Sequence, residues 1–356
     1  MSDDLLAVLK RLSAAPGVSG AEATTLRALL VELLTPLADE VSVDVAGNVI
    51  AFKRGQQTGA SRYKVMLSAH MDEIGMIVTG LEGEFLRFTQ IGGIDDRVLL
   101  GQLVLVHGRR SLLGVIASRP PHVVLPEERG KVIPHDQLFV DVGLTANELK
   151  RQVRVGDIIS FDCEPVELRR DLIAGKAMDN RASVTAMYAC LQGLIELNHA
   201  WDVYAVATAQ EEHGSYLGAT TFAFRLQPHL ALVVDTTFGH MVGLSEAETF
   251  KLGAGPAFSV GPNIHPAIHR RLASLADSLE IPYQTEPLPG HSGTEAWGLQ
   301  ISRVGIPTGI ISIPIRNMHT PIEVVALKDV TRAGRLLAHF VAGLEGTFVE
   351  DMIPGT

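Results

Sequence analysis

VYAVATAQEEHG, residues Val203–Gly214, is the stretch from which the architecture of the chain follows most directly. Its valines and alanines form an apolar run that predicts a buried strand, and Glu211 and Glu212 follow where a loop is expected. Functional groups of α/β proteins gather beyond the carboxyl ends of the strands. Because neighbouring side chains on extended backbone point to opposite faces, we expect different roles for the two carboxylates. Taken alone, such a pair is more often a pair of solvated loop charges than a functional site.

Polar residues also stand at the ends of other predicted strands and at the start of a predicted helix. They are His70 with Asp72, Asp179 with Asn180, Asp235, and His319. Two imidazoles and several carboxylates suit zinc or a similar first-row metal, and a carboxylate-rich set can hold two ions about 3.5–4 Å apart. On extended backbone His70 and Asp72 face the same way. Asp72 is then placed to accept the second N–H of His70 and to fix its tautomer.

Each of these positions has a simpler interpretation as well. A single histidine is more often a core or surface residue than a metal ligand. Asp179 could be the N-cap of a helix, and Asp235 could form a turn. The residue types alone leave these alternatives open.

The middle of the chain differs in pattern from the parts before and after it. In those two flanking parts, predicted helices and strands alternate. From about Glu73 to Asp171, short β-like runs alternate with turns that contain glycine and proline, which is typical of a small barrel or sandwich. We therefore predict an α/β domain built from residues 1–72 and 172–356, with a β domain, residues 73–171, inserted into it.

Local patterns predict individual elements of the α/β part. Ser19 and Glu22 match a capping box at the start of a helix that buries Leu26 to Leu33. A further helix is predicted from Ala182 to Leu197. Strands are predicted at Lys64–Ala69, at His229–Val234, which ends in Asp235, and at Gly309–Pro314.

Composition excludes several functions. The net charge of −10, without a dense cluster of Lys and Arg, argues against nucleic-acid binding, and no apolar run is long enough to span a membrane. Cys163 and Cys190 lie in different predicted domains, which argues against a disulfide scaffold and for a reducing compartment. The N-terminal segment is acidic and amphipathic, unlike a signal peptide. We therefore expect a cytoplasmic protein.

Several phrases along the chain carry a family resemblance. They are PGVSGAE (Pro16–Glu22), SAHMDEIG (Ser68–Gly75), KAMDNRAS (Lys176–Ser183), ATAQEEHGSYLGA (Ala207–Ala219), VVDTT (Val233–Thr237), LGAGP (Leu252–Pro256) and GIPTGIISIPIRNMHTPIEVV (Gly305–Val325). In these phrases, their order and their spacing, the chain resembles the tetrahedral (TET) aminopeptidases. That family includes glutamyl and deblocking aminopeptidases and FrvX-like proteins, and it belongs to the dinuclear metallopeptidase clan MH.

The resemblance implies a fold and an assembly. It implies a phosphorylase/hydrolase-like three-layer α/β/α catalytic domain, into which a small PDZ-like β-barrel is inserted as a dimerisation domain. It further implies that dimers of this chain assemble into a hollow tetrahedral dodecamer, and that the partners of the enzyme are peptide substrates.

The resemblance also implies a dinuclear metal site with residues in defined roles. The implied metal ligands are His70, Asp179, Glu212, Asp235 and His319. Asp179 would bridge the two divalent ions, Glu211 would act as the general base, and Asp72 would orient His70. Zinc is the expected metal, and cobalt or manganese would also suit these ligands.

The chain departs from the family pattern at one loop. Gly293–Ala296 reads GTEA where GTDA is more usual, and His291 with Ser292 replaces small residues just before it. The resemblance therefore makes His291, Thr294 and Glu295 candidate substrate-binding residues. Alternatively, Glu295 simply begins a helix near its positive end.

Three functions remain compatible with the sequence. The leading hypothesis is an aminopeptidase that removes N-terminal residues from peptides. The second is a related metallo-deacylase or carboxypeptidase-like hydrolase, and the third is a catalytically silent metal-binding assembly protein. An intact Glu211 favours an enzyme, since a purely structural metal site needs no base.

Overall fold

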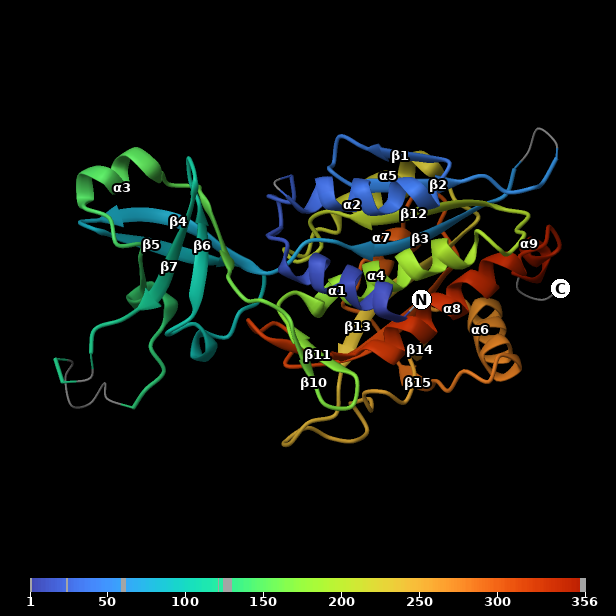
Figure 1. Cartoon of the computed structure of the whole chain (residues 1–356). Coiled ribbons are helices and arrows are strands. Elements are labelled where there is room, and N and C mark those ends of the chain that lie inside the picture. Colours follow the sequence, from blue (N-terminus) through green and yellow to red (C-terminus); the bar gives the residue numbers. More distant parts are fainter. Residues whose placement is uncertain (1, 24, 59–61, 121, 124–129, 353–356) are drawn as a thin grey trace.

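The computed structural model describes residues 2–23, 25–58, 62–120, 122–123 and 130–352. The chain forms two lobes, a larger one with helices on both faces of a sheet and a smaller one built around a closed barrel (Figure 1). This is the predicted combination of a three-layer α/β domain and an inserted β-barrel, and it confirms the expected fold class. Of the predicted domain limits, residues 1 and 356 lie outside the described residues.

Eleven strands of the described chain form the sheet of the larger lobe. Its main path runs β1 (Glu40–Val43), β2 (Val49–Lys53), β12 (Asp202–Thr208), β3 (Lys64–His70), β13 (Leu230–Phe238), β16 (Thr308–Arg316), β17 (Glu323–Ala326), β11 (Leu172–Gly175) and β10 (Val166–Leu168). Two further strands, β14 (Ala257–Val260) and β15 (Gln284–Pro287), extend from β16. The central strands β12, β3, β13 and β16 are parallel. They are buried on both faces, which explains their continuous apolar sequences.

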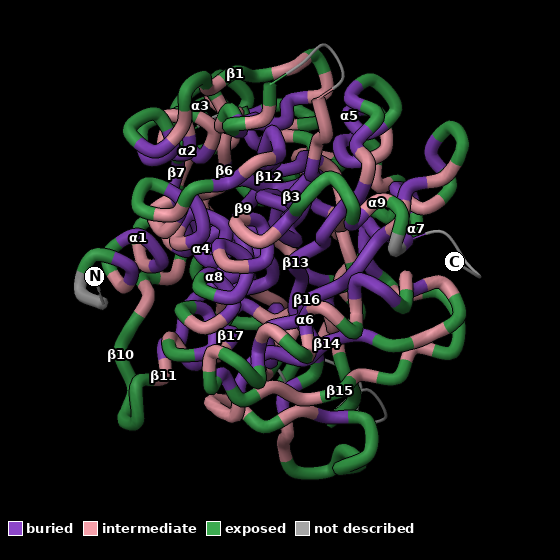
Figure 2. Tube along the Cα trace, turned by 90° about the vertical axis from the view of Figure 1, so that its right-hand side faces the viewer, coloured by how far each residue is buried: buried purple, intermediate pink, exposed green. Residues whose placement is uncertain are grey.

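Helices cover both faces of this sheet. One face packs against α1 (Ser2–Ala14), α2 (Leu26–Leu34), α4 (Met178–Gly193), α6 (Pro266–Ser278) and α8 (Leu327–Ala342). The other face packs against α5 (Leu217–Leu226) and α7 (Ala296–Gln300). Successive side chains of β13 point to opposite faces of the sheet. Leu232 and Val234 therefore pack in the apolar core on the first face, and Ala231 and Val233 pack in the core on the other face. Figure 2 shows the resulting buried core at the centre of the lobe.

Some short elements complete the described chain. They are α9 (Phe348–Asp351) and the 3-10 helices η1 (Thr35–Leu37), η2 (Asp96–Val98) and η4 (His135–Gln137). None of the helices in the described ranges combines the length and apolar character that a membrane crossing requires.

The smaller lobe is a closed barrel with its own apolar core. Around the barrel the strands are β4 (Gly75–Glu82), β5 (Phe85–Ile91), β8 (Phe139–Asp141), β7 (Ser111–Ala117), β6 (Leu103–His107) and β9 (Ile158–Phe161). The helix α3 (Ala146–Gln152) begins with a capping box, in which Glu148 accepts from the backbone N–H of Thr145. Closure leaves no free strand edge in the barrel, so it is a self-contained unit.

A buried ionic cluster joins the segments that flank the lobe boundary. The Glu73 Oε2 atom lies 2.6 Å from Lys176 Nζ, and Glu73 Oε1 lies 3.9 Å from Arg181 Nη2. Glu73 also accepts the N–H of Gly17 at 2.8 Å. Burial lowers the pKa of Lys176, and the neighbouring Glu73 carboxylate offsets part of that shift. Since Glu73 follows Asp72, and Lys176 precedes the turn that carries Asp179, the cluster links two segments of the candidate site.

Two sequence-based predictions about local structure were wrong. The helix α2 begins at Leu26, so Ser19 and Glu22 do not form a capping box at its start. Glu22 is instead buried, and its Oε1 accepts the N–H of Gly20 at 2.9 Å and that of Gln210 at 3.1 Å. A tertiary contact with the loop after β12 therefore replaces the local cap. Asp235 does not end its strand, because β13 continues to Phe238 through pairing with β16.

Candidate active site

The structure brings the polar residues of five separate segments together at the carboxyl end of the sheet. His70 ends β3, Asp235 lies in β13, Asp179 is in the first turn of α4, and His319 follows β16. Glu212 comes from the loop after β12. The topology explains this convergence, since neighbouring parallel strands present their carboxyl ends at one edge.

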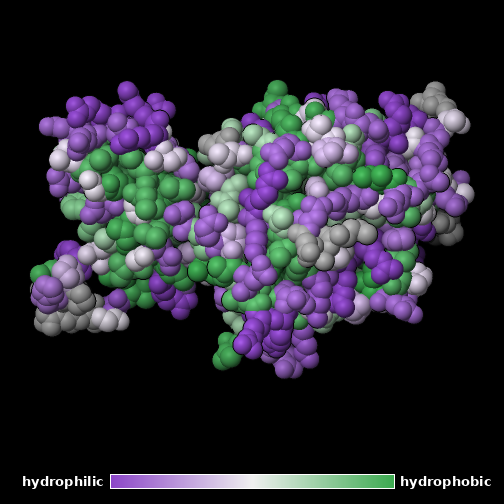
Figure 3. Space-filling view, in the orientation of Figure 1, coloured by the Kyte–Doolittle hydropathy of each residue, from purple (hydrophilic) through white to green (hydrophobic). Residues whose placement is uncertain are grey.

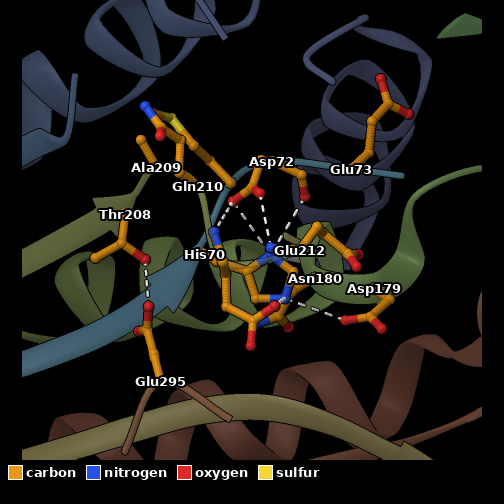
Figure 4. Close-up of polar contacts among 12 residues, drawn as sticks. His70, Asp72, Glu73, Asp179, Asn180, Thr208, Ala209, Gln210, Glu212 and Glu295 are labelled. Carbon is orange, nitrogen blue, oxygen red and sulfur yellow. Dashed lines mark hydrogen bonds and ion pairs between the residues drawn. The ribbon is translucent and has the colours of Figure 1, made fainter. Parts of the chain in front are cut away.

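The imidazole of His70 lies between two groups of acidic residues (Figure 4). Its Nε2 atom is 3.3 Å from Asp179 Oδ1, 3.7 Å from Asp235 Oδ1 and 4.0 Å from Glu211 Oε2. Its Nδ1 atom is 3.2 Å from the Asp72 carbonyl oxygen and 3.6 Å from Asp72 Oδ1. Because the carbonyl oxygen can only accept, Nδ1 carries a proton and Nε2 faces the carboxylates.

The second imidazole, that of His319, has an equivalent arrangement. Its Nδ1 atom is 3.0 Å from the carbonyl oxygen of Gly93, in the segment that follows β5 of the barrel. Its Nε2 atom is 3.4 Å from Glu212 Oε2 and 3.5 Å from Asp179 Oδ2. Asp179 therefore lies between the two imidazoles, with one carboxylate oxygen toward each. The contact with Gly93 also shows that the two lobes meet at this site.

Both glutamates of the opening stretch reach the same cavity, contrary to the expectation of opposite faces. The expectation assumed extended backbone, but Gln210 adopts a left-handed conformation with φ of 62° and turns the chain after β12. The carboxylate of Asp72 then accepts both following N–H groups, from Glu211 at 3.1 Å and from Glu212 at 3.0 Å. Asp72 thus contacts His70 and holds the glutamate loop at the same time.

Left-handed backbone recurs next to the candidate residues. Ala177, Gln210 and His319 have φ values of 54°, 62° and 60° although none is a glycine. Such conformations cost on the order of 1–3 kcal/mol each and persist where the surroundings enforce them. Their position beside Asp179 and Glu211, and at His319 itself, is typical of a functional site.

Sequence reasoning missed Glu323, whose side chain ties two of these segments together. It is buried at the start of β17, where its Oε2 accepts the N–H of Asp179 at 2.9 Å and its Oε1 accepts the N–H of His319 at 2.7 Å. Burial raises the pKa of Glu323, and the nearby Asp179 carboxylate raises it further. An acidic residue four positions after His319, opening the apolar strand EVVA, was the available signal.

Burial and like charge dominate the electrostatics of the cluster. Burial raises the pKa of Glu211 to about 7, with His70 opposing and Asp72 and Asp179 adding to the shift. Burial likewise raises the pKa values of Glu212 and Asp235. These shifts mean that more negative charge is concentrated here than the two imidazoles balance.

This donor set fits a divalent metal ion. Ligand atoms of His70, Asp179 and Glu212 lie within 4.8 Å of one another, and two histidines with carboxylates are suitable ligands for zinc. Asp179 Oδ1 is buried without a hydrogen-bond partner within the described chain, as expected for an atom that a cation would satisfy.

The cluster lies at one end of a cavity of about 550 Å³. The residues that line it are His70, Asp179, Glu211, Glu212, Gly214, Tyr216, Asp235, Thr236, Thr237, Phe238, Ala247, Glu248, Phe250, Glu286, Pro287, Leu288, Ser292, Gly293, Thr294, Met318 and His319. The cavity therefore extends from His70 and Asp179 across the sheet to β15. Its size is appropriate for one amino-acid side chain and the adjoining backbone of a peptide.

The three candidate substrate-binding residues of the loop that departs from the family pattern lie in different environments. Thr294 lines the cavity. Glu295 is buried, and its Oε2 accepts from the Thr208 hydroxyl at 2.5 Å, so its carboxylate is not exposed to a substrate (Figure 4). His291 is exposed, and its ring lies 4.7 Å from that of Trp297 and 6.1 Å from that of Tyr216. Of the three, only Thr294 lies where it can contact a molecule in the cavity directly.

Comparisons with known proteins agree with this fold. The family model described as M42 glutamyl aminopeptidase matches residues 47–336. A lysyl aminopeptidase of Pyrococcus furiosus is 35% identical over 92% of this chain and 94% of its own length. The crystal structure of a TET aminopeptidase from Thaumarchaeota archaeon SCGC AB-539-E09 covers 99% of both chains, with 30% identity and a TM-score of 0.92.

A further solved structure is that of the TET1 peptidase from Pyrococcus horikoshii, which can assemble into a tetrahedron or a large octahedral shell. It is 29% identical and covers 96% of this chain and 100% of its own, with a TM-score of 0.83. Fold and comparisons together define the class of this protein, a hydrolase of peptide bonds that acts as an aminopeptidase. The chain belongs to the M42 glutamyl aminopeptidase family.

We predict that Glu323→Gln weakens metal binding by about 10–100-fold, the usual effect of altering a group that positions metal ligands. The amide would present an NH₂ group to one of the two backbone N–H groups that the carboxylate now accepts. Calorimetric titration of chelator-treated protein with zinc measures this change. Glu345→Gln, at an exposed position, is the matched control. An unchanged dissociation constant for Glu323→Gln would contradict the assigned role.

Proposed function

We propose that the cluster holds two divalent metal ions, and that Glu211 is the base of a hydrolytic aminopeptidase reaction. His70 and Asp235 would hold one ion, Glu212 and His319 the other, and Asp179 would bridge them. The observation that carries the proposal is the position of Asp179, whose two oxygens face different imidazoles at 3.3 and 3.5 Å. We propose zinc as the metal, with cobalt and manganese as alternatives that suit the same ligands.

The side chains around this centre supply the remaining chemistry. When bound, the metal ions would acidify a water molecule and polarise the scissile carbonyl group. Glu211 would take the proton of the attacking water and deliver it to the departing amine, as a general base and then a general acid. Its pKa, which burial raises to about 7, reflects the buried and negatively charged surroundings that such a role requires. Asp72 would keep Glu211 and His70 in place.

Removal of an N-terminal residue distinguishes this proposal from a deacylase or carboxypeptidase-like activity. We predict that chelator-treated protein, reloaded with zinc, cobalt or manganese, releases the first residue of peptides that have a free α-amine. N-acetylated versions of the same peptides should remain intact. Mass spectrometry of the products measures both. Cleavage of the acetylated peptides, or release of the C-terminal residue, would favour the alternative hydrolases.

The variant Glu211→Gln tests the role of the base. We predict that it lowers kcat by about 10²–10⁴-fold, the usual contribution of general acid–base catalysis, and that it keeps its metal ions. Kinetics with elemental analysis of the same sample measure the two properties together. Glu196→Gln, at an exposed position outside the cavity lining, is the control. Full activity of Glu211→Gln would refute the assignment, and loss of metal would make Glu211 a ligand. A metal-loaded wild type without turnover would favour the silent assembly protein.

We propose that residues 73–171 are a dimerisation domain, and that the dimers assemble into a dodecamer. Support comes from the outer face of β6 and β7, where Leu103, Leu105, Leu113 and Val115 are cross-strand neighbours. Leu103 and Leu113 are 50% and 55% exposed, and Figure 3 shows hydrophobic surface on this lobe. Exposed apolar patches of this kind mark protein interfaces.

The TET1 peptidase of P. horikoshii, which assembles into closed shells, provides the comparison for this assembly. Light scattering should give a mass of about twelve chains for the wild type, and Leu113→Asp should reduce it by introducing a charge into the interface. A monomeric wild type, or an unaffected variant, would argue against the proposal. We also retain the cytoplasm as the proposed compartment, because Cys163 and Cys190 are both free thiols.

A further inference from the structure

The cavity beside the proposed catalytic centre receives the first residue of the substrate, so its lining determines which N-terminal residue the enzyme prefers. We propose that the enzyme prefers substrates with an N-terminal lysine or arginine, and that the carboxylate of Glu286 selects them. The inference rests on the proposed aminopeptidase function, since it assigns the far end of the same cavity to the first side chain of the substrate.

Glu286 presents a carboxylate that the protein holds in place without a cation. Its Oε1 accepts from the Thr237 hydroxyl at 2.5 Å, and its Oε2 accepts from the hydroxyls of Ser259 at 2.9 Å and Ser312 at 2.6 Å. Three neutral donors from three strands fix its orientation. No lysine or arginine in the described ranges forms an ion pair with Glu286, so its charge is left for a ligand to balance.

The position of Glu286 relative to the metal-binding end suits a long side chain. Thr237, which donates to Glu286, lies two residues beyond Asp235 on the same face of β13. Two residues of a strand span about 6.6 Å, at roughly 3.3 Å per residue. A substrate residue whose backbone lies next to Asp235 would therefore need a side chain with several carbons between its backbone and its charge. Lysine and arginine have this property.

The walls of the cavity suit the aliphatic part of such a side chain. Phe238, Phe250 and Leu288 line the cavity together with Glu286, and apolar surface favours the methylene groups of lysine and arginine while their charged ends reach a polar partner. Within the part of the chain that the structure describes, the cavity lining contains no lysine or arginine.

The negative charge of the cavity also argues against a preference for an acidic N-terminal residue. Among the described residues that line the cavity, six carry carboxylates, namely Asp179, Glu211, Glu212, Asp235, Glu248 and Glu286. The first four belong to the proposed catalytic centre, so Glu248 and Glu286 remain to interact with the substrate. An N-terminal glutamate would place its side chain beside these two like charges, which selects against it.

The first test compares side chains of similar length on the wild-type enzyme. We measure kcat/KM for lysyl, arginyl, norleucyl and glutamyl 4-nitroanilides, with the same metal present throughout. A hydrogen-bonded charge contributes about 1.5–3 kcal/mol, so lysyl should exceed norleucyl by about 10–100-fold, and glutamyl should be the poorest substrate. This comparison needs no variant, so it does not depend on how any substitution affects folding.

The second test is Glu286→Gln, since its amide keeps the size of the side chain and removes its charge. We expect kcat/KM for the lysyl substrate to fall by about 10–100-fold, mainly through KM. The norleucyl substrate should change by no more than about threefold. Glu246→Gln is the matched control, because Glu246 is an exposed glutamate outside the cavity lining.

The outcomes separate this inference from the proposed function. Turnover of norleucyl and glutamyl substrates without a lysyl or arginyl preference would overturn the inference and leave the aminopeptidase standing. An equal loss with all substrates in Glu286→Gln would also overturn it, because that pattern indicates a structural role. Absence of turnover of every substrate, with two metal ions bound per chain, would overturn the proposed function and the inference with it.

Discussion

Burial of several carboxylates beside only two imidazoles is the constraint on which the rest of the structure depends. Carboxylates that lose water and repel one another favour protonation, as the raised pKa of Glu212 shows. The fold opposes this tendency with backbone donors and two imidazoles, and a divalent ion would complete the balance. Asp179 shows the protein's own contribution most clearly, because the neighbouring imidazoles of His319 and His70 lower its pKa against the effect of burial.

The scaffold holds these groups through contacts between side chains and backbone. Asp72 accepts the N–H groups of Glu211 and Glu212, and Glu323 accepts those of Asp179 and His319. Each carboxylate thereby fixes two segments that are far apart in sequence. Bonds of this kind orient catalytic groups without depending on the flexible ends of long side chains. The parallel central strands place His70, Asp235, His319 and the glutamate loop at one edge of the sheet, whereas Asp179 follows β11 and Glu323 opens β17.

The sequence predicted a large part of this arrangement, for identifiable reasons. The buried strands, the inserted barrel and the convergence of His70, Asp235 and His319 follow from apolar runs and from the topology of parallel sheets. The family resemblance supplied the fold and the expectation of a metal site. The prediction that Glu211 and Glu212 point to opposite faces was wrong. It assumed extended backbone, and the left-handed conformation of Gln210 ends the strand geometry before Glu211.

What the sequence could not predict are contacts between distant segments. Glu22 matched a local helix cap but bonds to the loop after β12. Glu323 and Glu286 carry no local signature of their roles, since their partners lie on other strands. Glu295 illustrates the converse, because a conspicuous change from the family pattern proved to be a buried residue bonded to Thr208. Pattern and spacing identify elements, whereas these roles depend on the assembled sheet.

The location of the metal ions is the most direct test of the account. Crystals of the protein grown with zinc, and measured at the zinc absorption edge, would give anomalous peaks at the ion positions. We predict two peaks per chain, one on either side of Asp179, about 3.5–4 Å apart as in other two-metal hydrolytic sites. One peak would lie beside His70 and Asp235, and the other beside Glu212 and His319. A single peak, or peaks away from Asp179, would contradict the dinuclear centre.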